Sequence, residues 1–83
     1  MMEFDKAMKN DEFSAVNDYY EETGANILKA YTHNKEAMRL HERGFYKAAK
    51  HHAEHVLGLS LKATEQIGKA IAMAKAIEVS PSV

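Results

Sequence analysis

The stretch that decides the fold is "HERGFY", His41 to Tyr46, near the middle of the 83-residue chain. Gly44 suits the left-handed position just beyond a helix, and Arg43 suits the negative end of the helix dipole. Phe45 follows as the hydrophobic residue of a Schellman-type helix end. We therefore predict that one helix ends here, that another begins, and that the turn lies at Gly44.

After the turn, small and apolar residues recur with alternating steps of three and four, which predicts one helix from about Phe45 to Val79. Gly58 and Gly68 lie within it and each costs about 1 kcal/mol relative to alanine, yet the pattern keeps its phase through both. The recurring positions are Tyr46, Ala49, Ala53, Val56, Ser60, Ala63, Ile67, Ala70, Ala74 and Ile77.

The same rhythm precedes the turn and predicts a second long helix, starting near Asn10 or Asp11. The phase before Gly24 correctly anticipates the apolar positions after it, which favours one helix over two. The alternative is a three-helix bundle with a break near Gly24, because "EETGAN" is also typical of a loop. The recurring positions are Phe13, Val16, Tyr20, Thr23, Ile27, Ala30, Asn34, Ala37 and His41.

The predicted fold class is all-α, an antiparallel hairpin of two helices of about 35 residues, each about 50 Å long. Residues 1–83 form one domain, with residues 1–9 and 80–83 expected to fray. A two-helix hairpin has no enclosed core, so its apolar stripe needs a partner, and a second copy gives a dimeric four-helix bundle. The expected dimer interface consists of Phe13, Val16, Tyr20, Ile27, Tyr46, Ala49, Ala53, Val56, Ala63, Ile67, Ala70, Ala74 and Ile77.

Charge is divided unevenly along the chain, although the formal net charge is only −1. Residues 1–28 hold seven acidic and two basic side chains, whereas residues 29–62 hold seven basic, three acidic and all five histidines. Two hairpins with their turns at opposite ends would bring these unlike segments level with each other, which favours that orientation. The acidic residues are Asp11, Glu12, Asp18, Glu21 and Glu22, and the basic ones are Lys35, Arg39, Arg43, Lys47 and Lys50.

The stretch "KHHAEHV", residues 50–56, holds three of the five histidines. His51 and His55 are one helical turn apart and are the candidate metal ligands, although a zinc site commonly has three or four protein ligands. His33 and His55 are each eleven residues from Gly44, so they are expected to be neighbours across the hairpin. A pH-sensing role is an alternative, because imidazoles gain charge below about pH 6.5. Solvated or salt-bridged surface histidines are the simplest interpretation.

Composition excludes several classes of function. The chain has no cysteine, so it forms no disulfide and no thiolate metal site. Its charged N-terminal stretch is unlike a signal peptide, and charges interrupt the apolar stretch 56–77, so we expect a cytoplasmic protein outside the membrane. We find no nucleophile elbow and no phosphate-binding glycine loop, so we expect neither enzymatic activity nor a cofactor.

These observations predict a non-enzymatic helical scaffold or protein-interaction module that acts as a homodimer. One alternative is a metal- or ligand-binding bundle that uses His51 and His55. Another is a weak nucleic-acid binder through the basic turn region, where aromatic residues lie among lysines and arginines. The sequence pI of about 6.5 argues against nucleic acid as a partner.

The segment "RGFYKAAKHHAEHV", residues 43–56, resembles the centre of a tetratricopeptide repeat in its Gly44, Tyr46 and Ala49. The repeat's tryptophan is replaced by His33 and its closing proline by Leu61, so the resemblance implies a helical hairpin and no more. The segment "YKAAKHHAEHVLGLSLKATE", residues 46–65, resembles small bacterial Ala- and His-rich helical proteins. That resemblance implies a bacterial helical protein and no particular chemistry.

Overall fold

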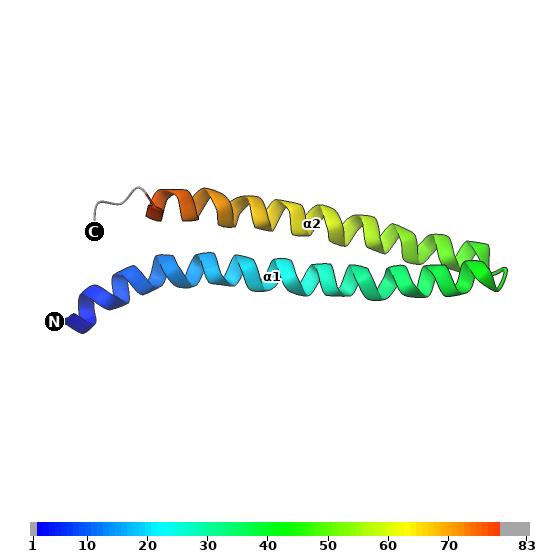
Figure 1. Ribbon diagram of the computed structural model, residues 1–83, viewed down its shortest axis with the longest axis horizontal. Helices are drawn as coiled ribbons and strands as arrows, with labels where there is room; N and C mark the ends of the chain where they lie inside the picture. The colour runs from blue at the N-terminus through cyan, green and yellow to red at the C-terminus, as the bar shows by residue number, and fades with distance from the viewer. Residues whose placement is uncertain (1, 79–83) are drawn as a thin grey trace.

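Two long helices lie side by side and are joined by a tight turn at one end (Figure 1). The structure, a computed structural model, describes residues 2–78, with side chains from residue 12 onward. Helix α1 spans Met2–Glu42 and helix α2 spans Tyr46–Glu78, and no strand occurs in this part of the chain. The predicted all-helical hairpin is therefore confirmed.

The turn is the Schellman motif that "HERGFY" predicts. The amide of Phe45 donates to the carbonyl of Leu40 at 2.9 Å, and the amide of Gly44 donates to the carbonyl of His41 at 3.0 Å. These two bonds satisfy carbonyls that the end of α1 leaves without helical partners. Gly44 has φ of 88°, in the left-handed region that costs a residue with a Cβ about 1–2 kcal/mol.

Helix α1 passes through Gly24 without a break, so the three-helix alternative is wrong. The hydroxyl of Thr23 donates to the carbonyl of Tyr19 at 2.7 Å, one turn earlier in the same helix. The loop-like composition of "EETGAN" is overridden because the apolar phase on both sides of Gly24 requires one continuous helix to meet α2.

The helix ends differ slightly from the prediction. Helix α1 begins at Met2, so the predicted start near Asn10 is wrong. The preceding stretch contains good helix formers, which allow the helix to continue. Helix α2 begins at Tyr46, one residue later than predicted. The predicted end at Val79 and the expected fraying of residues 80–83 lie outside the described residues.

The interior between α1 and α2 is made of small side chains. Among residues 12–78, the buried apolar residues are one valine and four alanines, namely Val16, Ala30, Ala49, Ala63 and Ala70. Small residues let the two helices approach closely, but each methyl group contributes only about 0.8 kcal/mol when buried.

The hairpin is elongated and exposes more surface than a compact chain of its mass. It measures 63 × 21 × 14 Å and has a radius of gyration of 18.6 Å, against about 12 Å for a globular domain of this length. Its accessible surface is 6575 Å², about a third more than the ~5,000 Å² typical of a folded monomer of 9.3 kDa. The single chain therefore lacks a full hydrophobic core.

Candidate functional site

The two long sides of the hairpin differ in chemistry. On one side, the rows next to the buried seam are mostly apolar, and we call this side the groove face. On the other, the rows next to the seam carry amides and imidazoles together with the half-buried Leu40, Leu59 and Met73, and we call it the polar face. The groove face carries Phe13, Tyr20, Ile27, Asn34 and His41 of α1 and Tyr46, Ala53, Ser60, Ile67 and Ala74 of α2. The polar face carries Tyr19, Asn26, His33, His52 and Gln66.

Large apolar side chains on the groove face are left uncovered. Phe13 is 68% exposed, Tyr20 48% and Ile27 55%. Tyr31 and Met38 of α1 and Leu57 and Ile71 of α2 are exposed at positions flanking these rows. These uncovered aromatic and aliphatic side chains form an exposed apolar row along the helix.

Two hollows lie along the groove face between the helices. The central hollow, of about 340 Å³, lies among Thr23, Ile27, Ser60 and Ile67 and is floored by Ala63. The turn-end hollow, of about 570 Å³, lies closer to Gly44. Its apolar lining consists of Ala37, Met38, Tyr46, Ala49 and Ala53, and its polar lining consists of Asn34, His41, Glu42 and Lys50.

The predicted dimer-interface residues divide between the seam and the groove face. Val16, Ala49, Ala63 and Ala70 are buried between α1 and α2, and Val56 is half-buried. The others lie toward solvent to different degrees. Phe13, Tyr20, Ile27, Tyr46, Ala53 and Ile77 are exposed, and Ile67 and Ala74 are half-buried. The predicted stripe therefore consists of two rows. One row is buried between α1 and α2, and the other lies exposed or half-buried on the groove face.

The polar face holds a chain of amide hydrogen bonds that sequence reasoning missed. The Asn26 Nδ2 donates to Gln66 Oε1 at 2.7 Å, and Gln66 Nε2 donates to Glu22 Oε1 at 2.7 Å. Asn26 is only 8% exposed, so this bond satisfies an otherwise buried amide. The only available signal was spacing, since Asn26 lies 18 residues before Gly44 and Gln66 lies 22 after it.

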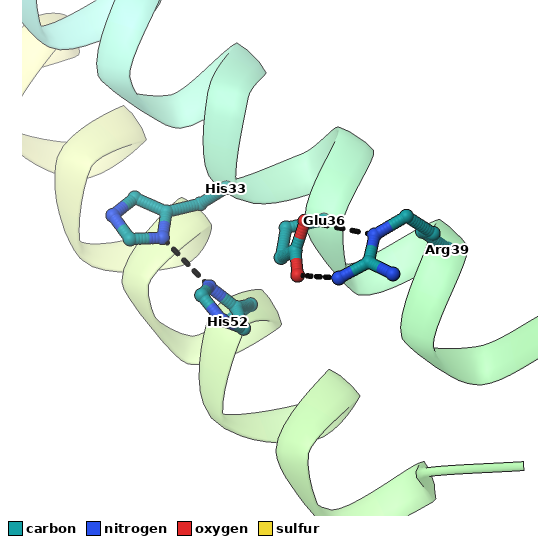
Figure 2. A network of polar contacts seen from close by, with 4 residues as sticks. All are labelled: His33, Glu36, Arg39 and His52. Atoms are coloured by element: carbon teal, nitrogen blue, oxygen red, sulfur yellow. Dashed lines mark hydrogen bonds and ion pairs between the residues drawn. The ribbon is translucent and has the colours of Figure 1, made fainter. Parts of the chain in front are cut away.

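Three histidines meet across the hairpin on the same face. The Nδ1 atoms of His33 and His52 are 2.8 Å apart, so the protonated Nδ1 of one ring donates a hydrogen bond to the bare Nδ1 of the other (Figure 2). The rings of His33 and His55 stack with centroids 4.8 Å apart, which confirms the expected neighbours across the turn. The centroids of His33 and His52 lie 5.0 Å apart.

The candidate metal ligands His51 and His55 have different neighbours. His51 Nδ1 lies 3.6 Å from Glu54 Oε1 and its side chain is 59% exposed, whereas His55 stacks on His33. Among the residues with described side chains, no group of three or more potential ligands is arranged to hold a metal ion. His51 and His55 therefore lie one helical turn apart on α2, and no described side chain joins them as a third metal ligand.

Next to the histidines, Glu36 and Arg39 form a surface ion pair (Figure 2). The Arg39 Nε donates to Glu36 Oε1 at 3.1 Å, and its Nη2 donates to Oε2. The hydrogen bond from Arg39 is the main cause that lowers the pKa of Glu36 below 4.5, and the same bond raises the pKa of Arg39. The pair stabilises the fold when Glu36 is ionised, and this contribution is lost as pH falls through the lowered pKa of Glu36.

The arrangement is suited to binding another surface. The exposed apolar side chains of the groove face provide area for contact, and the polar face is largely satisfied by its own hydrogen bonds. Neither described helix is both long enough and apolar enough to cross a membrane. Comparison of the chain with protein-family models, curated proteins and solved structures found no match to any of them.

Proposed function

We propose that this protein is a non-enzymatic helical scaffold that acts as a homodimer, in which the groove faces of two hairpins pack together as a four-helix bundle. The observation that carries the proposal is that polar side chains are buried between the helices while large apolar side chains remain exposed. Asn26 and Thr23 are buried, at 8% and 7% exposure, while Phe13 and Ile27 remain more than half exposed. A chain that folded alone would gain by burying the apolar row first.

The proposed partner is a second copy because its surface complements the first. A stable homodimer buries about 800 Å² or more per chain, and the hairpin exposes well over 1,000 Å² beyond a compact monomer of its mass. Ala53, Ser60 and Ala74 on the groove face have small side chains, so two α2 helices can approach closely. The acidic first half and the basic turn region supply unlike charges for the two copies to match.

The proposed scaffold needs no catalytic activity, cofactor or bound metal. It also places the dimer in the cytoplasm, a compartment with which a chain lacking cysteine is compatible. Nucleic acid is not proposed as a partner, because the basic residues of the turn region are assigned to the acidic segment of the second copy.

Light scattering and sedimentation equilibrium at micromolar concentration test the proposal. We expect a mass twice that of the 9.3 kDa chain and a melting temperature that rises with protein concentration. A helical, cooperatively folded species of 9.3 kDa would show that the hairpin is stable alone and would end the proposal.

Matched lysine substitutions test which face is used. Ile27→Lys and Ile67→Lys place a charge on the groove face and should convert the dimer to monomer. Leu28→Lys is the control, because Leu28 is 65% exposed but lies about 100° further round α1 than Ile27. Equal effects of Ile27→Lys and Leu28→Lys would show that the groove face is not the interface.

A further inference from the structure

An exposed aromatic side chain and a hollow with apolar walls and a polar rim lie toward opposite ends of the same groove face. Phe13 is 68% exposed. The turn-end hollow, of about 570 Å³, lies near the other end of α1, where Ala37 and Met38 form one wall and Tyr46, Ala49 and Ala53 form the other. Within one chain the two features cannot meet, because 24 residues of the continuous helix α1, about 36 Å, separate Phe13 from Ala37.

The spacing along α1 allows them to meet between two chains. Phe13 lies 14 residues before Ile27, and His41, at the edge of the turn-end hollow, lies 14 residues after it. Each interval is about 21 Å of helix. A two-fold axis that passes beside Ile27, perpendicular to α1, therefore brings Phe13 of each chain level with His41 of the other.

Charge favours this end-for-end orientation. It places Glu21 and Asp18, at the Phe13 end of one chain, near the level of Lys35, Arg39 and other basic residues of the second chain. The alternative, with both turns at the same end, brings the basic turn regions together and the acidic segments together, which is repulsive. The central hollow beside Ile27 would lie on the two-fold axis, opposite its own copy.

We infer that in the proposed homodimer Phe13 of each chain fills the turn-end hollow of the other, so that the dimer is end-for-end and is anchored by two identical aromatic contacts. This inference rests on the proposed dimer and adds to it the orientation, the anchor residue and the pocket that receives it. An aromatic side chain seated in a hollow of the partner chain is typical of the residues that dominate association energy.

Single-cysteine variants test the orientation, and every linkage is unambiguous because the chain has no cysteine of its own. Phe13→Cys, Met38→Cys and Ile27→Cys are each treated with a short bis-maleimide, alone and in mixtures. We expect Phe13→Cys and Met38→Cys to link to each other when mixed and neither to link to itself. Ile27→Cys should link to itself in either orientation, because Ile27 is central in the proposed interface.

The outcomes separate this inference from the proposal beneath it. Self-linkage of Phe13→Cys and of Met38→Cys would show that the turns lie at the same end, and would overturn the inference while leaving the dimer intact. Linkage of Ile27→Cys with none in the mixture would also overturn it. Failure of Ile27→Cys to link, together with a monomeric mass, would overturn the dimer itself.

A substitution measures the anchor directly in the unmodified chain. Phe13→Ala should raise the dimer dissociation constant at least tenfold without changing the helical content, because Phe13 is exposed in the single hairpin. Leu28→Ala is the matched control for loss of an exposed apolar side chain on α1 and should change the dissociation constant less than twofold. Equal changes in the two variants would remove Phe13 from the role of anchor.

Discussion

At the scale of single residues, the most informative feature is the amide chain that joins the two helices. Asn26 is buried and its partner is Gln66, which in turn donates to Glu22. An amide pair contributes little net stability compared with an apolar pair, but an amide left without its partner costs about 1–3 kcal/mol. These residues therefore act mainly to set the register in which α1 and α2 pair.

The amide chain predicts that removing one partner lowers the free energy of unfolding and that removing both restores it. Gln66→Ala should lower the free energy of unfolding by about 1–3 kcal/mol, because it leaves the buried Asn26 amide unpaired. The double variant Asn26→Leu/Gln66→Leu should recover that loss, because it removes both polar partners. Urea titrations followed by circular dichroism at fixed protein concentration measure both. A double variant as unstable as Gln66→Ala would contradict this account.

At the scale of elements, the turn and the continuity of α1 could be predicted, and the pairing of rows could not. "HERGFY" carries the full signature of its Schellman motif, and the apolar phase across Gly24 is preserved because a single helix must present one stripe to α2. The apolar stripe of α1 contains two neighbouring rows. One row includes Val16 and Ala30, the other includes Tyr20 and Ile27, and the side chains of both are suitable for burial. Sequence alone does not say which row α2 covers.

The contacts of the polar face could not be predicted from the hydrophobic pattern either. His33 and His52 lie on the seam side of the polar face, but polar residues add nothing to a hydrophobic period. The distance from Gly44 correctly predicted that His33 and His55 are neighbours, because residues equally far from a tight turn come level in a hairpin. It did not predict the pairing of Asn26 with Gln66, since that pair is offset by four residues.

Two glycine substitutions test the helical elements in opposite directions. Gly58→Ala should raise the free energy of unfolding by about 1 kcal/mol, because the helix gains a better former and an added Cβ meets no atom within 4 Å. Gly44→Ala should lower it by about 1–2 kcal/mol, because φ of 88° is strained for alanine even though space is open there. A stabilising Gly44→Ala would mean that the turn adopts another conformation.

At the scale of the whole molecule, the hairpin is a rod whose two ends carry opposite charge. The acidic residues 11–22 lie in the half of α1 remote from the turn and Arg39 and Arg43 lie at the turn end, so the charge of each rod is polarised along its length although its net charge is only −1. In an end-for-end dimer the attraction between these regions acts along the length of the interface and is exposed to solvent ions at its edges.

This polarity predicts a salt-dependent association. Raising sodium chloride from 0.05 to 1 M should increase the dimer dissociation constant several-fold, because the Debye length falls from more than 10 Å to about 3 Å. Arg43→Glu should weaken the dimer at low salt and reduce its salt dependence. Sedimentation equilibrium measures both. A dissociation constant that falls as salt rises would indicate that like charges, and not unlike ones, face each other.

The alanine-rich seam has a consequence for how the molecule opens. The buried apolar side chains between α1 and α2 are small, and the polar contacts between the helices are the amide chain at Asn26 and the histidines, so the hairpin is held most firmly near the turn, where the Schellman bonds and the three histidines lie within a few helical turns of each other. A hairpin deprived of its twin should therefore unzip from the tip remote from Gly44, and its amide hydrogens should exchange with deuterium fastest there and slowest beside His33 and His52.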